Sequence, residues 1–230
     1  MSMKLSVIVP VYNEHGTLVE LLNRVSAVPL PKEIIVVDDG STDGSRTVLE
    51  GFQGRPGFVI RYHDRNRGKG RAIRTGLEAV TGDVVVVQDA DLEYDPNDFV
   101  PMLAPNREGR ARAVYGSRRM RHTNKQHSGV IYYLGGMLVT YVTRWLYRLD
   151  ITDEATCYKM LETNLMRSLN LKCERFEFCP EVTAKLAKRK EPILEIPISY
   201  FPRHKSEGKK IGWKDAVEAI WTLLKFKFRD

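Results

Sequence analysis

The sequence D-V-V-V-V-Q-D-A-D-L-E-Y-D-P occupies residues Asp83 to Pro96 and joins four valines to a series of acidic side chains. Four successive β-branched residues are too few for a helix and suit a strand buried on both faces of a mostly parallel sheet. Acidic residues follow at every second position: Asp89, Asp91, Glu93 and Asp95. Because open α/β sheets bind ligands beyond the carboxyl ends of their strands, we expect a ligand site here.

Clustered carboxylates repel one another unless a cation or donor groups compensate them. Mg²⁺ and Mn²⁺ prefer oxygen ligands and keep open positions for phosphate oxygens. Asp89, Asp91 and Glu93 are therefore candidate metal ligands, and a metal-bound phosphate or diphosphate is the expected ligand. An isolated Asp-x-Asp also fits a polar loop that merely ends a strand. The other motifs of the chain are needed to distinguish a metal site from such a loop.

Three strand–loop–helix units precede the valine strand. The predicted strands are 5–11, 33–37 and 58–62, and the first helix is expected to open at a Thr17–Glu20 capping box. Polar loops follow the strands at 12–14, 38–44 and 66–70, where Ser41 or Thr42 can cap a helix and the loop 66–70 is expected to shape a ligand pocket. This alternation predicts an α/β fold with a doubly wound, mostly parallel sheet, whose polar loops converge at one edge.

The second half continues with less regular patterns. We predict a helix over 97–103, a strand over 113–115, a helix over 178–188 and a strand over 193–200. The apolar stretch 130–148 reads as a helix in which Gly135-Gly136 makes a break plausible. Residues 213–228 form an amphipathic pattern, which divides the chain into a domain over 1–212 and a C-terminal helix over 213–230.

Composition describes a globular protein with an anionic partner. The 230 residues are 43% hydrophobic and 28% charged, with a formal net charge of +7. Much of the excess lies in 107–125 and 203–230, and these basic segments adjoin apolar stretches instead of aromatic stacking platforms. Nucleic acid is therefore an unexpected partner.

The number and spacing of the cysteines and the sequence of the N-terminus favour a location in the cytoplasm. Cys157, Cys173 and Cys179 are odd in number and contain no C-x-x-C pair, which favours reduced thiols in the cytoplasm over disulfides or a zinc site. We expect no secretory leader and no bilayer-spanning run, and hence a chain that is soluble or peripheral to a membrane.

The ordered polar motifs match what a nucleotide sugar requires. Asp38, with Tyr12 and Glu14, could hold the base and ribose, while Asp89 and Asp91 could hold a cation on the diphosphate. A metal that neutralises the departing diphosphate would make transfer at the anomeric carbon feasible.

Four motifs carry a family resemblance: Pro10-Val-Tyr-Asn-Glu14, Asp38-Asp-Gly-Ser-Thr-Asp-Gly44, Asn66-Arg-Gly-Lys-Gly70 and Asp89-Ala-Asp-Leu92. They resemble the family 2 inverting glycosyltransferases with a GT-A fold. Later motifs look like the dolichol-phosphate mannose synthase branch and its bacterial polyprenyl-phosphate relatives: Tyr115-Gly-Ser-Arg118, Thr152-Asp153, Pro197-Ile-Ser-Tyr200, Arg203 and Glu207-Gly-Lys-Lys-Ile211.

The resemblance implies roles for individual residues. The nucleotide would contact Pro10, Tyr12, Glu14 and Asp38, while Asp89 and Asp91 would bind Mg²⁺ or Mn²⁺ and the diphosphate. Arg118 and Arg203 would contact phosphates, and Lys209 would be a further donor-binding residue. Asp91, Arg118 and Asp153 are the catalytic candidates. Dolichol-phosphate mannose synthases commonly carry Gln at the position of Glu93, so the donor stays open between GDP-mannose and UDP-glucose.

The expected acceptor is a polyprenyl or dolichyl phosphate. A monoalkyl phosphate is already ionised at neutral pH, so its enzyme needs cations more than a general base. A basic stretch runs from Arg118 to His127, and the apolar segment 130–147 follows it. Together they suit binding of the phosphate group of a lipid beside an apolar groove. The helix 213–228 suits either anchoring at the cytosolic face of a membrane or packing on the domain, and a homo-oligomer stays open.

Three alternatives remain at this point. Asp153 could be the base of a family 2 enzyme acting on a glycan or glycolipid hydroxyl, or could cap a helix. A nucleotidyltransferase would use a similar sheet and metal, and a non-catalytic membrane partner would bind nucleotide sugar without turnover. The histidines show no metal-ligand spacing, and His15, His63, His122 and His204 are expected on the surface.

Overall fold

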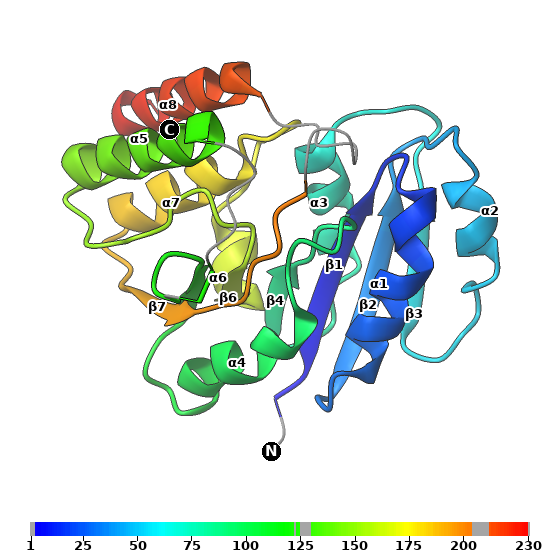
Figure 1. The fold of residues 1–230 in the computed structure, drawn as a ribbon. Coiled ribbons are helices and arrows are strands. Elements are labelled where there is room, and N and C mark those ends of the chain that lie inside the picture. The colour runs from blue at the N-terminus through cyan, green and yellow to red at the C-terminus, as the bar shows by residue number, and fades with distance from the viewer. Residues whose placement is uncertain (1–2, 122, 125–129, 204–211, 230) are drawn as a thin grey trace.

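The computed structural model describes residues 3–121, 123–124, 130–203 and 212–229. Its centre is a seven-stranded sheet in the order β3-β2-β1-β4-β6-β5-β7 (Figure 1). The strands are β1 (Leu5–Val11), β2 (Lys32–Asp38), β3 (Phe58–Tyr62), β4 (Val84–Val87), β5 (Ala113–Ser117), β6 (Lys159–Glu162) and β7 (Ile193–Pro197). The helices are α1 (His15–Ala27), α2 (Ser45–Glu50), α3 (Lys69–Glu78), the 3-10 helix η1 (Pro96–Asp98), α4 (Phe99–Arg107), α5 (Val130–Tyr147), α6 (Thr163–Ser168), α7 (Phe178–Lys188) and α8 (Trp213–Phe228).

Strands β1 to β4 are parallel, as predicted for a doubly wound sheet. Ile8 in β1 is level with Val87 in β4, and Val11 is level with Asp38 in β2. The loops that follow β1, β2 and β4 therefore leave from the same edge of the sheet. This arrangement brings the polar motifs of the first half together.

Strand β6 was not predicted, and it runs antiparallel between β4 and β5. Its four residues, K-M-L-E, lack the β-branched run that marks β1 and β4, so no sequence pattern indicated a strand. Because the direction of β6 is reversed, the segment that enters it comes from the edge where the parallel strands end. That segment carries Asp153.

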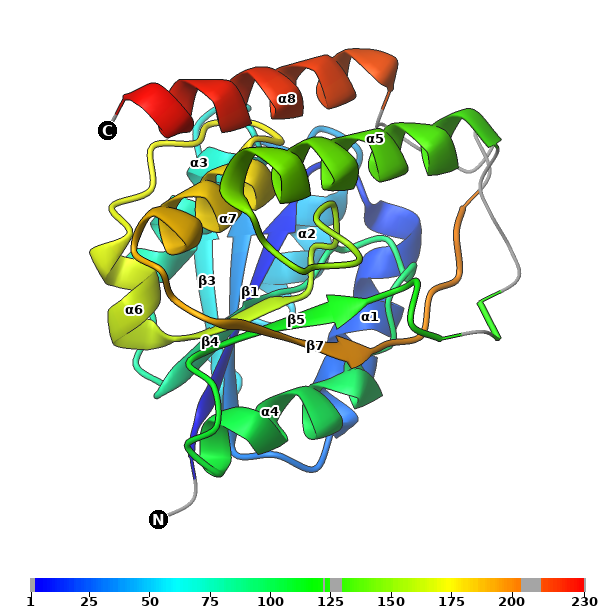
Figure 2. The same ribbon diagram turned by 90° about the vertical axis from the view of Figure 1, so that its left-hand side faces the viewer.

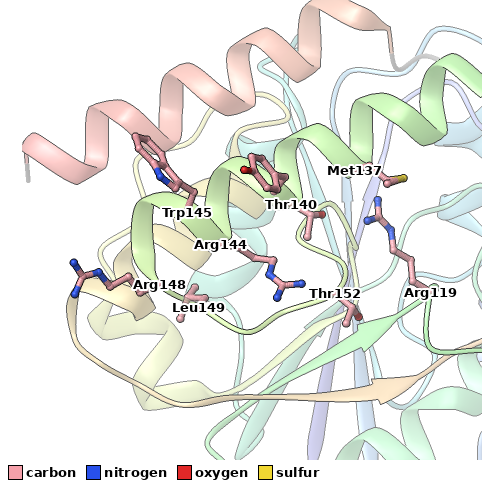
Figure 3. Close-up of a pocket in the computed structure, with 9 residues that line it drawn as sticks. Arg119, Met137, Thr140, Arg144, Trp145, Arg148, Leu149 and Thr152 are labelled. Atoms are coloured by element: carbon pink, nitrogen blue, oxygen red, sulfur yellow. The ribbon is translucent and has the colours of Figure 1, made fainter.

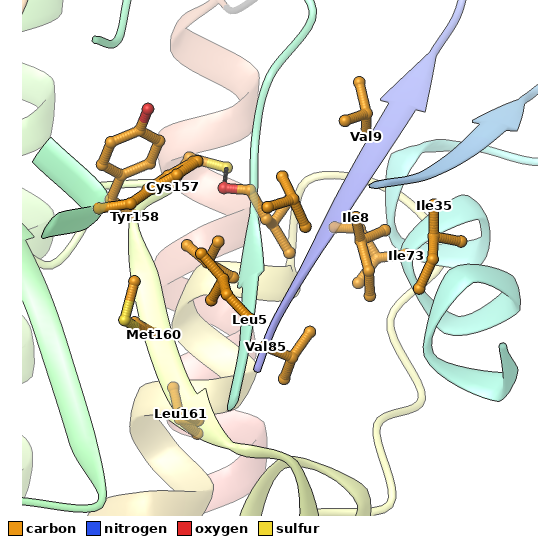
Figure 4. Close-up of a cluster of buried hydrophobic side chains, with 14 of the residues drawn as sticks. Leu5, Ile8, Val9, Ile35, Ile73, Val85, Cys157, Tyr158, Met160 and Leu161 are labelled. Carbon is orange, nitrogen blue, oxygen red and sulfur yellow. Dashed lines mark hydrogen bonds between the residues drawn. The ribbon is translucent and has the colours of Figure 1, made fainter. Parts of the chain in front are cut away.

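The core lies between the sheet and its helices. All four valines of β4 are fully buried, as expected for a strand covered on both faces. Around them, Leu5, Ile8, Met160 and Leu161 contribute apolar side chains from β1 and β6 (Figure 4).

Helices α5, α7 and α8 form a separate layer (Figures 1 and 2). Val139, Ala184, Leu223 and Phe226 form a small buried cluster between them, and the Tyr147 hydroxyl donates to the Leu223 carbonyl at 2.7 Å. One face of α8 thus packs on the domain. Within the described residues, no helix has both the length and the apolar character needed to cross a bilayer.

Several predicted boundaries were wrong. Helix α1 begins at His15 instead of Thr17, whose hydroxyl donates to the Ala90 carbonyl at 2.6 Å. Helix α2 follows Gly44 instead of opening at Ser41 or Thr42, and α4 extends to Arg107. Strand β7 ends at Pro197, and α5 continues without a break through the two central glycines.

Candidate active site

Carboxylates from two parallel strand ends meet at one arginine. Arg203 reaches Glu14, beyond β1, with Nη1 3.1 Å from Oε2, and Asp91, beyond β4, with Nη2 3.1 Å from Oδ2. Residues predicted from three separate motifs are therefore in direct contact. The predicted donor-binding residue Lys209 lies outside the described residues, as do Lys125 and His127 of the predicted basic stretch.

The Asp91 carboxyl is largely buried and lies beside other negatively charged side chains. Burial raises the pKa of its carboxyl to about 7, and the negative charges of Asp89 and Glu93 act in the same direction, while Arg203 opposes them. Leu92, next in the chain, has φ 63°, a left-handed conformation that is uncommon for a branched side chain. Two aspartates that provide oxygen ligands in these negatively charged surroundings fit a hard divalent cation held by Asp89 and Asp91.

Glu93 is engaged differently from the other two predicted metal ligands. Its carboxylate accepts hydrogen bonds from the Tyr200 hydroxyl at 2.8 Å and from the Arg203 backbone N–H at 2.8 Å. Across the described part of the chain, no group of three or more Asp, Glu, His or Cys side chains is arranged to hold a metal ion. These two hydrogen bonds help to hold Arg203 in place, and the role of Glu93 as a metal ligand beside Asp89 and Asp91 stays a prediction.

Asp89 is paired with a residue that the sequence did not single out. The Lys69 ammonium lies 2.5 Å from Asp89 Oδ1, and both side chains are 20% exposed. Lys69 is the first residue of α3 and belongs to the loop 66–70 that was predicted to shape a ligand pocket. Only the spatial proximity of the β4 and β3–α3 loops reveals the pair.

Asp38, predicted to hold the nucleotide, is completely buried and contacts Arg46. Arg46 Nε and Nη2 lie 2.9 and 2.7 Å from Asp38 Oδ2, while the Ser41 backbone N–H donates to Oδ1 at 3.2 Å. Tyr12 and Pro10 lie on the adjacent β1 end, where Tyr12 is 37% exposed. These residues share one corner of the sheet edge, and their role in binding a nucleotide stays a prediction.

Asp39 organises the neighbouring loop and was not predicted as a site residue. Its carboxylate accepts the backbone N–H groups of Arg67 and Gly68 at 2.9 and 2.8 Å and contacts His63 Nδ1 at 2.6 Å. His63 Nε2 is 3.0 Å from the Thr75 hydroxyl. The expectation that His63 lies on the surface was wrong, because its ring is buried between Asp39 and α3.

On the other side of the site, Arg118 and Asp153 form a two-point ion pair. Arg118 Nε is 2.6 Å from Asp153 Oδ2, and Nη2 is 2.7 Å from Oδ1. Burial would raise the pKa of Asp153, but the Arg118 charge and hydrogen bonds lower it below its usual value. Glu195 in β7 fixes this segment by accepting the backbone N–H groups of Thr152 and Asp153 at 2.7 and 3.1 Å.

Tyr200 connects the two halves of the site. Its hydroxyl donates to Glu93, and its ring lies 5.0 Å from the Arg118 guanidinium carbon. Tyr94 packs edge-on against the same ring at 5.4 Å. The carboxylate side and the Arg118 side are thus joined through one aromatic side chain.

An open groove of about 710 Å³ lies on the outer side of this region, beneath α5. Arg119 and Arg144 project into it beside Thr152 (Figure 3). Thr152 adjoins Asp153 and Arg119 adjoins Arg118, so the groove begins next to the ion pair. Its remaining lining residues are Met137, Thr140, Tyr141, Trp145, Arg148 and Leu149.

Comparison with known proteins identifies the family. The family model described as Glycosyl transferase family 2 matches residues 6–160. The chain belongs to this family, and its sheet and helices have the GT-A fold.

Two curated relatives have related names. An undecaprenyl-phosphate 4-deoxy-4-formamido-L-arabinose transferase of Shewanella sediminis is 28% identical over 95% of this chain and 65% of its own length. A dodecaprenyl-phosphate galacturonate synthase of Rhizobium johnstonii is 25% identical over 99% of this chain and 67% of its own length. The chain therefore spans about two thirds of the length of these relatives.

Solved structures share the fold at lower identity. Glucosyl-3-phosphoglycerate synthase from Mycobacterium tuberculosis, in complex with UDP, has a TM-score of 0.75 and 18% identity over 99% of this chain and 81% of its own. S. aureus TarS 1-349 has a TM-score of 0.63 and 18% identity over 98% of this chain and 72% of its own.

Proposed function

We propose that the protein moves a hexose, mannose or glucose, from GDP-mannose or UDP-glucose to a polyprenyl or dolichyl phosphate, with inversion at the anomeric carbon. Its family membership and the printed names of its curated relatives support sugar transfer to a polyprenyl phosphate. The GT-A sheet supports a nucleotide-sugar donor at the edge formed by β1, β2 and β4.

One observation carries the choice of acceptor: Asp153 is completely buried and bound at two points to Arg118. A carboxylate held by a guanidinium is a weak base, because proton uptake would break the ion pair. A hydroxyl acceptor needs a base, whereas a phosphate acceptor arrives ionised and needs positioning by cations. The arrangement therefore favours a phosphate nucleophile near Arg118, with Asp153 orienting the arginine.

On the donor side, we assign Pro10, Tyr12, Glu14 and Asp38 to the nucleotide and Arg203 and Lys209 to its phosphates. Asp89 and Asp91 would hold Mg²⁺ or Mn²⁺, which when bound neutralises the diphosphate. Arg203 lies between Glu14 and Asp91, at the sheet edge where the donor diphosphate would bind. The chain would thus supply a positive charge where negative charge develops.

The α5–α8 layer supports contact with the cytosolic face of a membrane. Apolar side chains remain exposed along α5 and α8, namely Leu134, Met137, Leu138, Tyr141, Trp145, Val217, Trp221 and Phe228. The two helices lie side by side at one end of the molecule (Figures 1 and 2). Aromatic and basic side chains on one such surface suit an anionic lipid interface, with Arg119 and Arg144 in the adjoining groove.

The proposal is tested by product analysis. Purified protein would be incubated with Mn²⁺ or Mg²⁺, a panel of GDP- and UDP-sugars and a short-chain polyprenyl phosphate, and the organic phase examined by mass spectrometry. A phosphate-linked hexose that disappears in folded Asp91→Ala protein is the expected result. Donor turnover only with a hydroxyl acceptor, or release of pyrophosphate, would replace the proposal by one of its alternatives.

A further inference from the structure

Lys69 has no part in the function proposed above, yet its backbone is fixed at the centre of the site. The preceding Gly68 donates to Asp39, and the following Gly70 donates to the Arg175 carbonyl at 2.8 Å. Gly68 has φ 93°, and a Cβ there would lie 2.3 Å from the Glu174 carbonyl oxygen. The loop is therefore held on both sides, and it directs the Lys69 side chain to Asp89.

A charge count shows what this ammonium does to the site. Among the residues that the structure describes, four carboxylates, from Glu14, Asp89, Asp91 and Glu93, are joined by two cations, Lys69 and Arg203. The formal charge of the six groups is −2 when all are ionised, which one divalent metal ion neutralises. Loss of the Lys69 charge would make the formal charge of these groups more negative by one unit.

We propose that Lys69 is a donor-binding residue that holds Asp89 before the nucleotide sugar arrives and then binds an oxygen of its diphosphate. This inference rests on the proposed function. As the bond from the anomeric carbon to the diphosphate breaks, its electron pair stays on the phosphate oxygen, while the acceptor phosphate oxygen forms the new bond to carbon. The leaving group gains one negative charge, so the contact with the ammonium strengthens during transfer.

The proposal predicts changes of opposite sign in two binding measurements. Lys69→Met removes a cation that competes with the metal for Asp89, so Mn²⁺ binding without nucleotide should tighten about tenfold, measured from the free Mn²⁺ signal by electron paramagnetic resonance. The same variant should bind UDP or GDP about tenfold or more weakly at saturating Mn²⁺, measured by calorimetry. A loss of local structure would weaken both.

Matched variants complete the experiment. Lys69→Arg keeps the charge and should stay within about threefold of the parent protein in both measurements. Lys4→Met removes an ammonium that pairs with Glu33 at 2.8 Å, at the opposite ends of the strands, and should change neither. Lys69→Gln provides a second neutral variant, and thermal melting identifies which neutral variant is folded.

Unchanged or weaker Mn²⁺ binding in a folded neutral variant, or undiminished nucleotide binding, would overturn the proposal. An equal loss of nucleotide binding in Lys69→Arg would overturn the requirement for charge. The Mn²⁺ and nucleotide measurements need no acceptor. A protein that binds UDP or GDP but transfers no sugar to a lipid phosphate would thus refute the proposed function, while these measurements still decide the role of Lys69.

Discussion

Arg118 and Asp153 bind each other through two parallel contacts of 2.6 and 2.7 Å, and the Asp153 side chain is excluded from solvent. Arg118 follows β5 and Asp153 precedes β6, so the pair joins two strands that run in opposite directions. The partners should act as a unit, since removing either one leaves an unpaired buried charge.

A double-mutant cycle tests this unit. Arg118→Gln and Asp153→Asn should each lower the free energy of unfolding by about 3 kcal/mol, and the double variant should lose clearly less than the sum. Lipid transfer should fall by a similar factor in all three proteins. Urea unfolding and initial rates provide the measurements. Additive losses of stability would show that the two residues do not act as a unit, and a much larger loss of activity in Asp153→Asn alone would identify Asp153 as a base.

Glu93 and Asp91 should respond differently to loss of charge. Glu93→Gln keeps an acceptor for Tyr200 or Arg203 and should change Mn²⁺ affinity by no more than about threefold. Asp91→Asn should weaken Mn²⁺ binding about tenfold or more, because a charged ligand becomes neutral. Direct titration with Mn²⁺ compares the variants, and equal losses would show that Glu93 is a metal ligand as well.

Gly68 and Gly54 offer a matched comparison of backbone strain and crowding. Both have positive φ, 93° and 78°, but a Cβ at Gly54 meets nothing within 4 Å, whereas one at Gly68 meets the Glu174 backbone. Gly54→Ala should cost about 1 kcal/mol from its positive φ. Gly68→Ala should cost about 2 to 3 kcal/mol, because its conformation of φ 93° and ψ 155° is almost exclusive to glycine and overpacking adds to the cost. Chemical denaturation measures both, and equal costs would contradict the close approach.

The exposed tryptophans of α5 and α8 should contribute to vesicle binding. Replacing Trp145 and Trp221 by Gln should lower partitioning to anionic phospholipid vesicles about tenfold, because two large apolar side chains leave the interface. Val19 and Val100, 46% and 42% exposed on α1 and α4, provide a control when both become Gln. Cosedimentation is the measurement. An equal loss in the control would place the contact elsewhere.

Glu33 should make stability depend on acid pH. Burial would raise its pKa, but hydrogen bonds from Lys4, Ser6 and Thr81 lower it to about 2 from a normal value of 4.5. The depressed pKa stabilises the folded state fully above pH 4.5, and this contribution is lost as the pH falls toward 2. Glu33→Gln should therefore cost about 2 kcal/mol at pH 7 and progressively less at pH 4 and 3 in urea titrations.

Regular hydrophobic patterns made much of the fold predictable. Strands β1, β3 and β4 and helices α7 and α8 lie where continuous β-branched runs or helical periodicity indicated them. Parallel strand ends fall at one edge, so the convergence of Glu14 and Asp91 also followed from the order of motifs. Local patterns could not predict the contact of both residues with Arg203, because Arg203 lies more than a hundred positions from either. Only the family resemblance placed Arg203 at the site.

The sequence predicted that the loops converge, but it did not predict which of their side chains form pairs. Lys69 and Asp89 form an ion pair because α3 begins near the end of β4. Asp39 contacts His63 because the loops that follow β2 and β3 pack against each other. Strand β6 has too few residues for its pattern to compete with a helical interpretation. Its position depends on the open edges of β4 and β5.

Those open edges have a consequence for biosynthesis. When the last residue of β5 has been synthesised, β6, the strand that will join it to β4, is still 45 residues from completion. Until then, β4 and β5 each present unpaired backbone groups that could pair with another chain. We therefore expect nascent chains that stop before Lys159 to aggregate and depend on chaperones, and those extended past Glu162 to become protease-resistant.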